Sequence, residues 1–354
     1  MLYHLAHYLE YYYPLFHVVH YVSFRAIASL LSTLILSFIG GNWFIIQSKI
    51  FFRSKARDLT PERHKLKDDM PTMGGIFILI VVLINSLLWC DLSKYHVWIF
   101  LLCLFLFGCI GAWDDWSKIR KQKGISGTIK FGLQCIAALI ITLLWLQLTH
   151  ASTTITFPFF KTLQPDIGFL FIPYAMFIIV GCSNAVNLTD GLDGLAIGSL
   201  MPNFVTFSLI AYLAGHYHFS EYLHIPFAGT AEIAIVGAIL IGASLGFLWY
   251  NTYPAQIFMG DVGSLALGAG LALMALMTKQ ELLLIIAGGL FVVEAVSVIA
   301  QVLSYQLRGK RILKMAPIHH HFELLGWQES KITVRFSIIT LILCLLAIVT
   351  LKLR

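Results

Sequence analysis

Residues 96–113 read HVWIFLLCLFLFGCIGAW, a run without a charged side chain that ends directly before Asp114-Asp115. A helix of about 20 apolar residues is long enough to cross the hydrocarbon core of a bilayer. The same pattern recurs along the chain, and ten segments qualify or nearly qualify as membrane spans. They are centred on residues 22–45, 73–90, 96–113, 128–149, 169–187, 194–214, 232–250, 262–278, 283–304 and 333–351. The sequence therefore predicts an all-α, polytopic membrane protein of about ten transmembrane helices.

The composition of the 354-residue chain independently excludes a soluble protein. Hydrophobic residues make up 58% of the chain and charged residues 12%, whereas a soluble domain has about 25% charged residues. The same figures exclude a disordered chain and a disulfide-built secreted domain. We expect one integral membrane domain over residues 1–354, in which residues 1–21 form an N-terminal segment at the membrane interface.

Lysine and arginine are distributed unequally between the two ends of the predicted spans. Eighteen of the 24 basic residues lie in the stretches after the first, third and ninth spans. An excess of basic residues in short loops marks the cytoplasmic side. The even number of spans then places both termini on the opposite, periplasmic side.

Five aspartates fall at the predicted cytoplasmic ends of spans: Asp114, Asp115, Asp190, Asp193 and Asp261. Carboxylates at membrane depth are costly and usually bind cations or transfer protons. A solvated helix end would also account for the Asp114-Asp115 pair, but adjacent carboxylates that are partly buried need a cation to offset their repulsion. The glycines of NLTDGLDG (187–194) and FMGDVG (258–263) would let the backbone approach a ligand closely. Hard oxygen ligands of this kind suit Mg²⁺ shared with substrate phosphates, so we expect an active site on the cytoplasmic face.

Two further motifs lie on the same predicted side. The first is APIHHHFE at residues 316–323, downstream of a basic stretch. Three consecutive histidines cannot all face one way on a helix, so the motif fits phosphate binding or a plain polar loop better than a zinc pair. The second is PTMGG at residues 71–75, which is equally compatible with the start of a helix and with a close approach to a nucleotide.

Taken together and in this order, these motifs resemble the bacterial phospho-N-acetylmuramoyl-pentapeptide-transferases, which belong to the polyprenyl-phosphate N-acetylhexosamine-1-phosphate transferase superfamily. The resemblance extends from about residue 40 to residue 350. It implies a multi-pass enzyme of the bacterial cytoplasmic (inner) membrane. The enzyme would transfer phospho-N-acetylmuramoyl-pentapeptide from UDP-N-acetylmuramoyl-pentapeptide to undecaprenyl phosphate, giving lipid I and UMP. It further implies Mg²⁺ as the cofactor, the lipid bilayer and a homodimeric copy as partners, and no nucleic acid.

The resemblance also assigns roles to residues of this chain. Asp261 would be the principal Mg²⁺ ligand, Asp114 the candidate base that deprotonates the lipid phosphate, and Asp115 a further group beside the metal. Substrate-binding residues by the same resemblance are Lys67, Thr72, Asn187, Asp190, Asp193, Asn251, Phe258, Gln301, His319, His320, His321, Lys118, Lys123 and Lys130. Within this set, Asp190, Asp193, Asn187 and Lys67 would hold the uridine, with Phe258 stacked on uracil. One departure stands next to Lys67, because Asp69-Met70 replaces the Gly-Thr that usually precedes the PTMGG motif.

The sequence leaves open two alternative functions, the reaction path and the role of Glu294. A related transferase would use UDP-N-acetylglucosamine, and a secondary transporter would also have many spans, although transporters place their charged sites near the midplane. The reaction could be a direct attack or proceed through an aspartyl-phosphate. Glu294, inside the ninth span, is either a functional acid or a hydrogen-bonding partner of Ser297 or of another helix.

Overall fold

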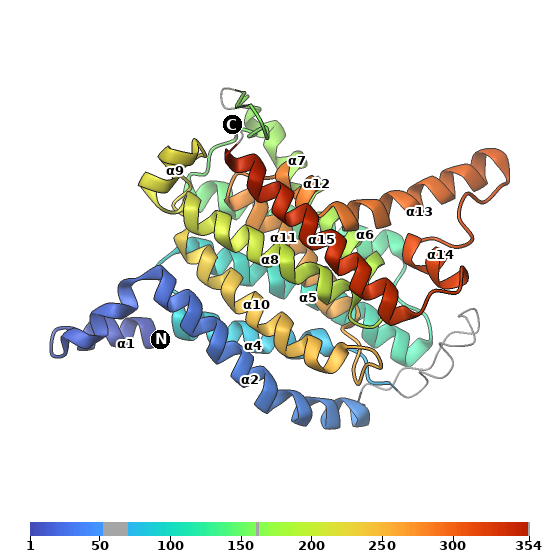
Figure 1. Ribbon diagram of the computed structural model, residues 1–354, viewed down its shortest axis with the longest axis horizontal. Coiled ribbons are helices and arrows are strands. Elements are labelled where there is room, and N and C mark those ends of the chain that lie inside the picture. Colours follow the sequence, from blue (N-terminus) through green and yellow to red (C-terminus); the bar gives the residue numbers. More distant parts are fainter. Residues whose placement is uncertain (52–69, 161–162, 353–354) are drawn as a thin grey trace.

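The computed structural model of the protein describes residues 1–51, 70–160 and 163–352, and Figure 1 shows that this part of the chain is built from helices. An isolated antiparallel bridge joins Thr154 to Asp166. The elements are α1 (Leu2–Leu9), η1 (Pro14–His20), α2 (Val22–Phe51), α4 (Gly74–Trp89), α5 (Tyr95–Lys121), α6 (Gly127–Thr149), η2 (Gly168–Leu170), α7 (Phe171–Thr189), α8 (Leu195–Ala214), α9 (Tyr217–Leu223), α10 (Ala231–Asn251), α11 (Gly260–Met277), α12 (Leu283–Ala287), α13 (Gly289–Arg308), α14 (Ile318–Leu324) and α15 (Glu329–Lys352).

The prediction of a polytopic all-α membrane protein is confirmed. Nine helices of the described residues are long and apolar enough to cross a membrane. The predicted span at 73–90 forms α4, which is apolar but has only 16 residues. At 1.5 Å per residue α4 is about 24 Å long, a little shorter than the hydrocarbon core. Its N-terminal end is held by backbone hydrogen bonds rather than by a further helical turn, as described below.

The centre of the bundle is occupied by α10 and α11, whose apolar windows are 83% and 89% buried, compared with 22% for α2. Both central helices are rich in glycine and alanine. Small side chains let the backbones of membrane helices approach one another, which is the main source of packing energy where lipid removes the hydrophobic driving force. α11 packs against α4, α5, α7 and α8, and its first turn carries Asp261.

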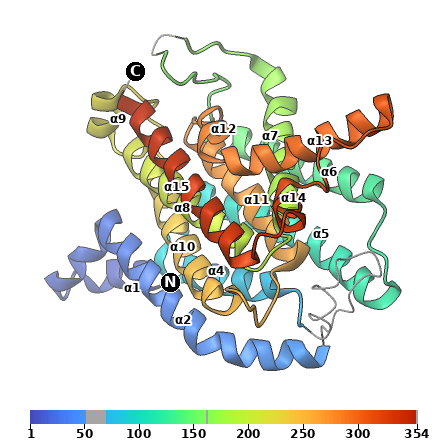
Figure 2. The ribbon, with the colours of Figure 1, turned by 45° about the vertical axis from the view of Figure 1, so that its right-hand side comes forward.

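The predicted single span at 283–304 is wrong in detail, because the chain breaks at Gly288 between α12 and α13. A glycine pair, Gly288-Gly289, lies at the break, and such pairs are common sites of helix kinks. After the break α13 leaves the bundle, and its C-terminal end lies apart from the other long helices (Figures 1 and 2). Only 17% of its apolar window is buried.

Both termini lie at the same end of the bundle. The amino group of Met1 donates a 3.2 Å hydrogen bond to the carbonyl of Leu88, at the end of α4. Lys352 Nζ lies 3.6 Å from the centre of the Tyr222 ring in α9. The C-terminal ends of α5 and α7 and the N-terminal end of α11 lie at the opposite end, since α4, α5, α6, α7, α8, α10 and α11 alternate in direction. The five aspartates therefore share one end, as the span count predicted.

Candidate active site

Three carboxylates form the centre of this end of the bundle. Asp114 and Asp115 lie near the C-terminal end of α5, and Asp261 lies in the first turn of α11. One oxygen of each lies within 4.8 Å of one oxygen of the other two. Asp114 and Asp115 are each only 4% exposed. These three carboxylates, of Asp114, Asp115 and Asp261, are called the acidic cluster.

The acidic cluster exists because α5 and α11 pack backbone against backbone. A Cβ atom at Gly111 would lie 2.3 Å from the carbonyl oxygen of Asp261, so only glycine fits there. Backbone groups also orient the carboxylates: Asp114 Oδ1 accepts from the N–H of Ile125 at 2.8 Å, and Asp115 Oδ2 accepts from the N–H of Val262 at 3.3 Å. The packing of the two helices and these backbone groups thus position the acids.

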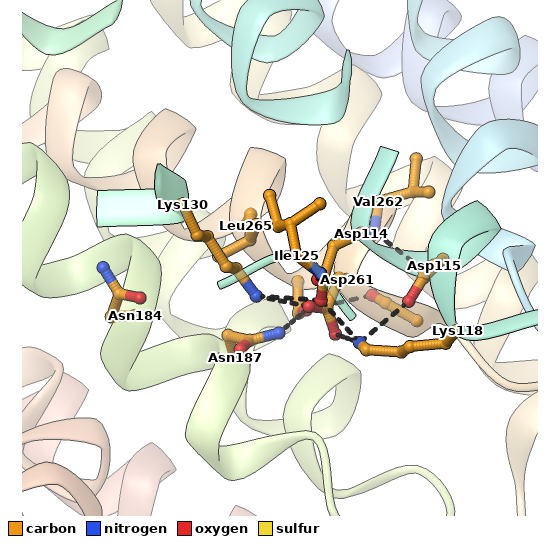
Figure 3. A network of polar contacts seen from close by, with 12 residues as sticks. Asp114, Asp115, Lys118, Ile125, Lys130, Asn184, Asn187, Asp261, Val262 and Leu265 are labelled. Carbon is orange, nitrogen blue, oxygen red and sulfur yellow. Dashed lines mark hydrogen bonds and ion pairs between the residues drawn. The ribbon is translucent and has the colours of Figure 1, made fainter. Parts of the chain in front are cut away.

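Two lysines neutralise much of the charge of the acidic cluster (Figure 3). Lys118, one helical turn beyond Asp114, places Nζ 2.8 Å from Asp114 Oδ2, 3.1 Å from Asp115 Oδ1 and 2.9 Å from Asp261 Oδ1. Lys130 enters from α6, with Nζ 3.4 Å from Asp114 Oδ2 and in contact with Asp261 Oδ2. Three carboxylates against two ammonium groups leave one negative charge. The donor set of hard oxygens fits a divalent cation such as Mg²⁺.

The NLTDGLDG loop joins α7 to α8 beside the acidic cluster. The Asn187 amide donates to Ser264 Oγ at 2.8 Å, which ties the end of α7 to α11. The Asp190 carboxyl accepts from the backbone of Gly260, and burial together with the charges of Asp261 and Asp115 raises its pKa to about 8. Asp190 therefore lies with the acidic cluster.

Asp193 and Asn251, unlike Asp190, bond to backbone groups of neighbouring loops. Asp193 Oδ2 accepts from the N–H of Ala255 at 3.1 Å, and Asn251 Oδ1 accepts from the N–H of Gly194 at 3.1 Å. The Asn251 amide also donates to the carbonyl of Ile257 at 2.8 Å. Both side chains thus hold the loop after α10 against the NLTDGLDG loop.

The PTMGG and FMGD motifs are joined by backbone hydrogen bonds. The N–H of Phe258 donates to the carbonyl of Pro71 at 2.9 Å, and the N–H of Gly74 donates back to the carbonyl of Phe258 at 2.8 Å. Thr72 lies next to Gly260, because a Cβ there would be 3.2 Å from Thr72 Oγ1. Lys67, the remaining predicted ligand of this region, lies outside the described residues.

The three histidines of APIHHHFE have different contacts, in agreement with the prediction that they cannot all face one way. His320 Nδ1 lies 3.0 Å from Glu323 Oε2, and His321 Nδ1 accepts from the N–H of Lys314 at 3.1 Å. His319 is fully buried, with Nδ1 3.1 Å from Glu294 Oε2. Burial is the largest influence on the pKa of His319 and lowers it.

His319 and Glu294 form a buried contact that connects α13 to the NLTDGLDG loop. A Cβ at Gly191 would lie 2.3 Å from His319 Nε2, so the imidazole stands against the backbone of that loop. The carboxylate of Glu294 is 0% exposed and comes from the projecting helix α13. Ser297 bonds to the backbone carbonyl of Glu294, at 2.6 Å, rather than to its carboxylate. The Glu294 carboxylate therefore contacts another helix, α14, through His319 and does not bond to Ser297.

Gln301 bonds to residues outside the acidic cluster, and Lys123 is exposed. Gln301 Oε1 accepts from the N–H groups of Ile312 and Leu313 at 3.0 and 2.9 Å, so its side chain closes the loop that follows α13. Lys123 is exposed in the short loop between α5 and α6. The structure thus gathers Asp114, Asp115, Asp190, Asp261, Lys118, Lys130 and Asn187, while Asp193, Asn251 and Gln301 bond to backbone groups of neighbouring loops.

Comparison with known proteins places this site in a family. The family model described as glycosyl transferase family 4 matches residues 97–279, just over half of the chain and including the whole acidic cluster. Phospho-N-acetylmuramoyl-pentapeptide-transferase from Citrifermentans bemidjiense is 50% identical over 358 aligned positions, which cover 100% of both chains. Proteins of the same name from Geobacter sp. (strain M21) and Syntrophus aciditrophicus are 49% and 48% identical, also over the full length of both chains.

Proposed function

Because the chain belongs to glycosyl transferase family 4, we propose that it transfers phospho-N-acetylmuramoyl-pentapeptide from its UDP carrier to undecaprenyl phosphate. The products are lipid I and UMP. The observation that carries this proposal is the buried acidic cluster, crossed by Lys118 and Lys130, at one end of a bundle of membrane-spanning helices. Identity over the full chain to relatives with this name favours the muramoyl substrate over UDP-N-acetylglucosamine. A transporter is disfavoured because the carboxylates lie at one end of the bundle and not at its middle.

The position of the site suits two substrates that differ in solubility. A nucleotide sugar is dissolved in the cytoplasm, whereas a polyprenyl phosphate is confined to the bilayer. Their phosphates can meet only at headgroup depth, where the ends of α5, α7 and α11 carry the acids. We therefore place this end on the cytoplasmic side of the bacterial inner membrane, where the excess of basic residues also favours anionic lipid.

The acidic cluster would hold Mg²⁺ through Asp261 with Asp114 and Asp115. When bound, Mg²⁺ neutralises the diphosphate of the nucleotide and stabilises the leaving UMP. The chain's own contribution is positioning and charge, which supply most of the catalysis of phosphoryl transfer. Lys118 and Lys130 stand where they can exchange carboxylate contacts for phosphate oxygens. Asp114 is the candidate base for the lipid phosphate, once one of its lysine contacts has been exchanged in this way.

An apolar groove lies between α4 and α5 and comes near the acidic cluster at Ala112 and Val262. It has a volume of about 540 Å³ and is lined by α4, α5 and, in the first turn of α11, Val262. Val262 is the residue whose N–H donates to Asp115. Ala112, one helical position from Gly111, also lines the groove. We propose that this groove binds the part of the prenyl chain next to the phosphate. If the phosphate of undecaprenyl phosphate lies at the acidic cluster, the first part of its chain can lie along the apolar residues of α4 and α5.

The direct test replaces Asp261 with asparagine. Purified protein in detergent receives UDP-N-acetylmuramoyl-pentapeptide and undecaprenyl phosphate, and UMP release and lipid product are measured across Mg²⁺ concentrations. We expect Asp261→Asn to lose more than about 99% of the rate, because a charged ligand in a preorganised site contributes several kcal/mol. The matched control, Asp91→Asn, removes a carboxylate at the other end of the bundle and should keep full activity. Equal rates in the two variants would refute the assignment.

A further inference from the structure

A second group of metal-ligating side chains lies at the opposite end of the molecule, in the N-terminal segment. His7 lies in the last turn of α1, and Glu10, three residues further on, is the helical C-cap residue of α1, so the two side chains lie on one side of the helix end. His20 comes from the end of η1. His7 Nδ1 lies 3.3 Å from His20 Nε2 and 3.5 Å from Glu10 Oε2. His20 Nε2 also contacts Glu10 Oε2. Two imidazole nitrogens and a carboxylate oxygen thus converge on one point.

We propose that His7, Glu10 and His20 form a binding site for a divalent transition-metal ion of the zinc type. Two histidines and one glutamate are an established three-ligand set for Zn²⁺, which leaves a fourth position for water. Two of the three separations, 3.3 and 3.5 Å from His7 Nδ1, match the edge of a tetrahedron with zinc-ligand bond lengths, which is about 3.4 Å. His20 Nε2 and Glu10 Oε2 are in direct contact, closer than this edge, and would move apart to bind an ion. The nitrogen and oxygen donors also suit zinc better than Mg²⁺, which prefers oxygen ligands alone.

The surroundings of the site meet the other requirements for a metal centre. His17 Nδ1 lies 2.5 Å from Glu10 Oε1, the carboxylate oxygen that does not face the other ligands. Such a partner orients a ligating carboxylate and is normally part of a metal site. The side chains of His7 and His20 are 63% and 32% exposed, so an ion can enter from solvent. The site is therefore accessible as well as assembled.

The ion would fasten α1 to η1 and so stiffen a segment that is already docked on the bundle. Arg25, at the start of α2, packs its guanidinium 4.4 Å from the centre of the Tyr3 ring and pairs with Glu232 of α10 at 2.7 Å. The amino group of Met1 is held by the end of α4. We therefore predict that the metal stabilises the N-terminal segment and does not affect the reaction at the acidic cluster.

The test measures zinc binding by the full-length protein, purified in detergent without a polyhistidine tag. Titration calorimetry with ZnCl₂ is run in excess Mg²⁺, which keeps the acidic cluster occupied. His20→Ala and Glu10→Gln each remove one ligand, whereas His17→Ala removes only the orienting partner. The matched control, His218→Ala, removes an exposed histidine at the same end of the bundle. UMP release, measured without zinc, shows that each variant is folded.

We expect His20→Ala and Glu10→Gln to bind one zinc ion fewer per chain than wild type and His218→Ala. His17→Ala should keep the site with about 10- to 100-fold weaker affinity, the usual cost of losing an outer partner. Zinc should also raise the thermal unfolding midpoint of wild type but not of His20→Ala, and EDTA should reverse the rise. Equal zinc stoichiometry in wild type, His20→Ala and Glu10→Gln would overturn the proposal and leave only a hydrogen-bonded histidine cluster.

Discussion

Replacing Gly111 with alanine tests whether the close packing of α5 on α11 is what assembles the acidic cluster. The added Cβ would lie 2.3 Å from the carbonyl oxygen of Asp261 and 2.5 Å from its carbonyl carbon. Ordinary contact needs about 3.4 Å, so the two helices must separate by about 1 Å. Both neighbours are backbone atoms, which cannot rotate away as a side chain can.

The consequence for the reaction follows from that displacement. A shift of about 1 Å in catalytic groups costs about 100-fold in rate, or about 2.7 kcal/mol of transition-state stabilisation. Overpacking a close helix contact costs a further 1–3 kcal/mol of stability, roughly estimated from soluble cores. We therefore expect Gly111→Ala to fold with a lowered unfolding midpoint and to release UMP about 100 times more slowly.

The matched control is Gly132→Ala on α6, where an added Cβ meets no atom within 4 Å. Alanine is better than glycine in a helix by about 1 kcal/mol, so this variant should be at least as stable as wild type and fully active. The assay is UMP release at saturating Mg²⁺ and substrates, with thermal unfolding in detergent as the measure of folding. If Gly111→Ala matched Gly132→Ala in rate, the acids would not depend on the contact between α5 and α11, and the reasoning would fail.

Three further predictions follow from the same geometry. Lys118→Met should reduce kcat/KM for the nucleotide about 10- to 100-fold, because it removes charge-assisted contacts. It should also lower the Mg²⁺ concentration needed for half-maximal rate, because the three carboxylates lose a competing positive charge. Lys121→Met, at the exposed end of α5, should change neither quantity. Glu294→Leu should reduce the rate more than Glu294→Gln, since glutamine can still hold the imidazole of His319, and equal rates would show that the contact is dispensable. Burial raises the pKa of Glu281, outside the spans, to about 7, above its unfolded value of about 4.3. The folded state therefore keeps a proton that the unfolded state has lost, so wild-type stability should fall between about pH 4.3 and 7 through this group. The unfolding midpoint of Glu281→Gln measured against pH should have a flatter slope over that window, and parallel slopes would contradict the prediction.

The active-site end illustrates which features of a membrane protein can be predicted along the chain. The apolar runs predict the helices, and the charges that end them predict that Asp114, Asp190 and Asp261 share one end. The reaction and the roles of the site residues were inferred from the resemblance to known transferases. The break at Gly288 was missed, because a glycine pair inside an apolar run is compatible with both a continuous and a broken helix.

What the sequence determined by itself is therefore the class of protein, the approximate positions of most of its long helices and the end at which its acids lie. These follow from the cost of placing charge in lipid, which acts on each residue separately. Only the tertiary structure decided that Lys118 reaches three carboxylates and that Asn251 holds a loop. It also decided that His319 lies against Glu294 and that His7 faces His20. Apart from the pairing of Lys118 with Asp114 and Asp115 on its own helix, those contacts join residues from different elements. The distances between them are set by backbone packing at positions such as Gly111, which no periodicity along the chain records.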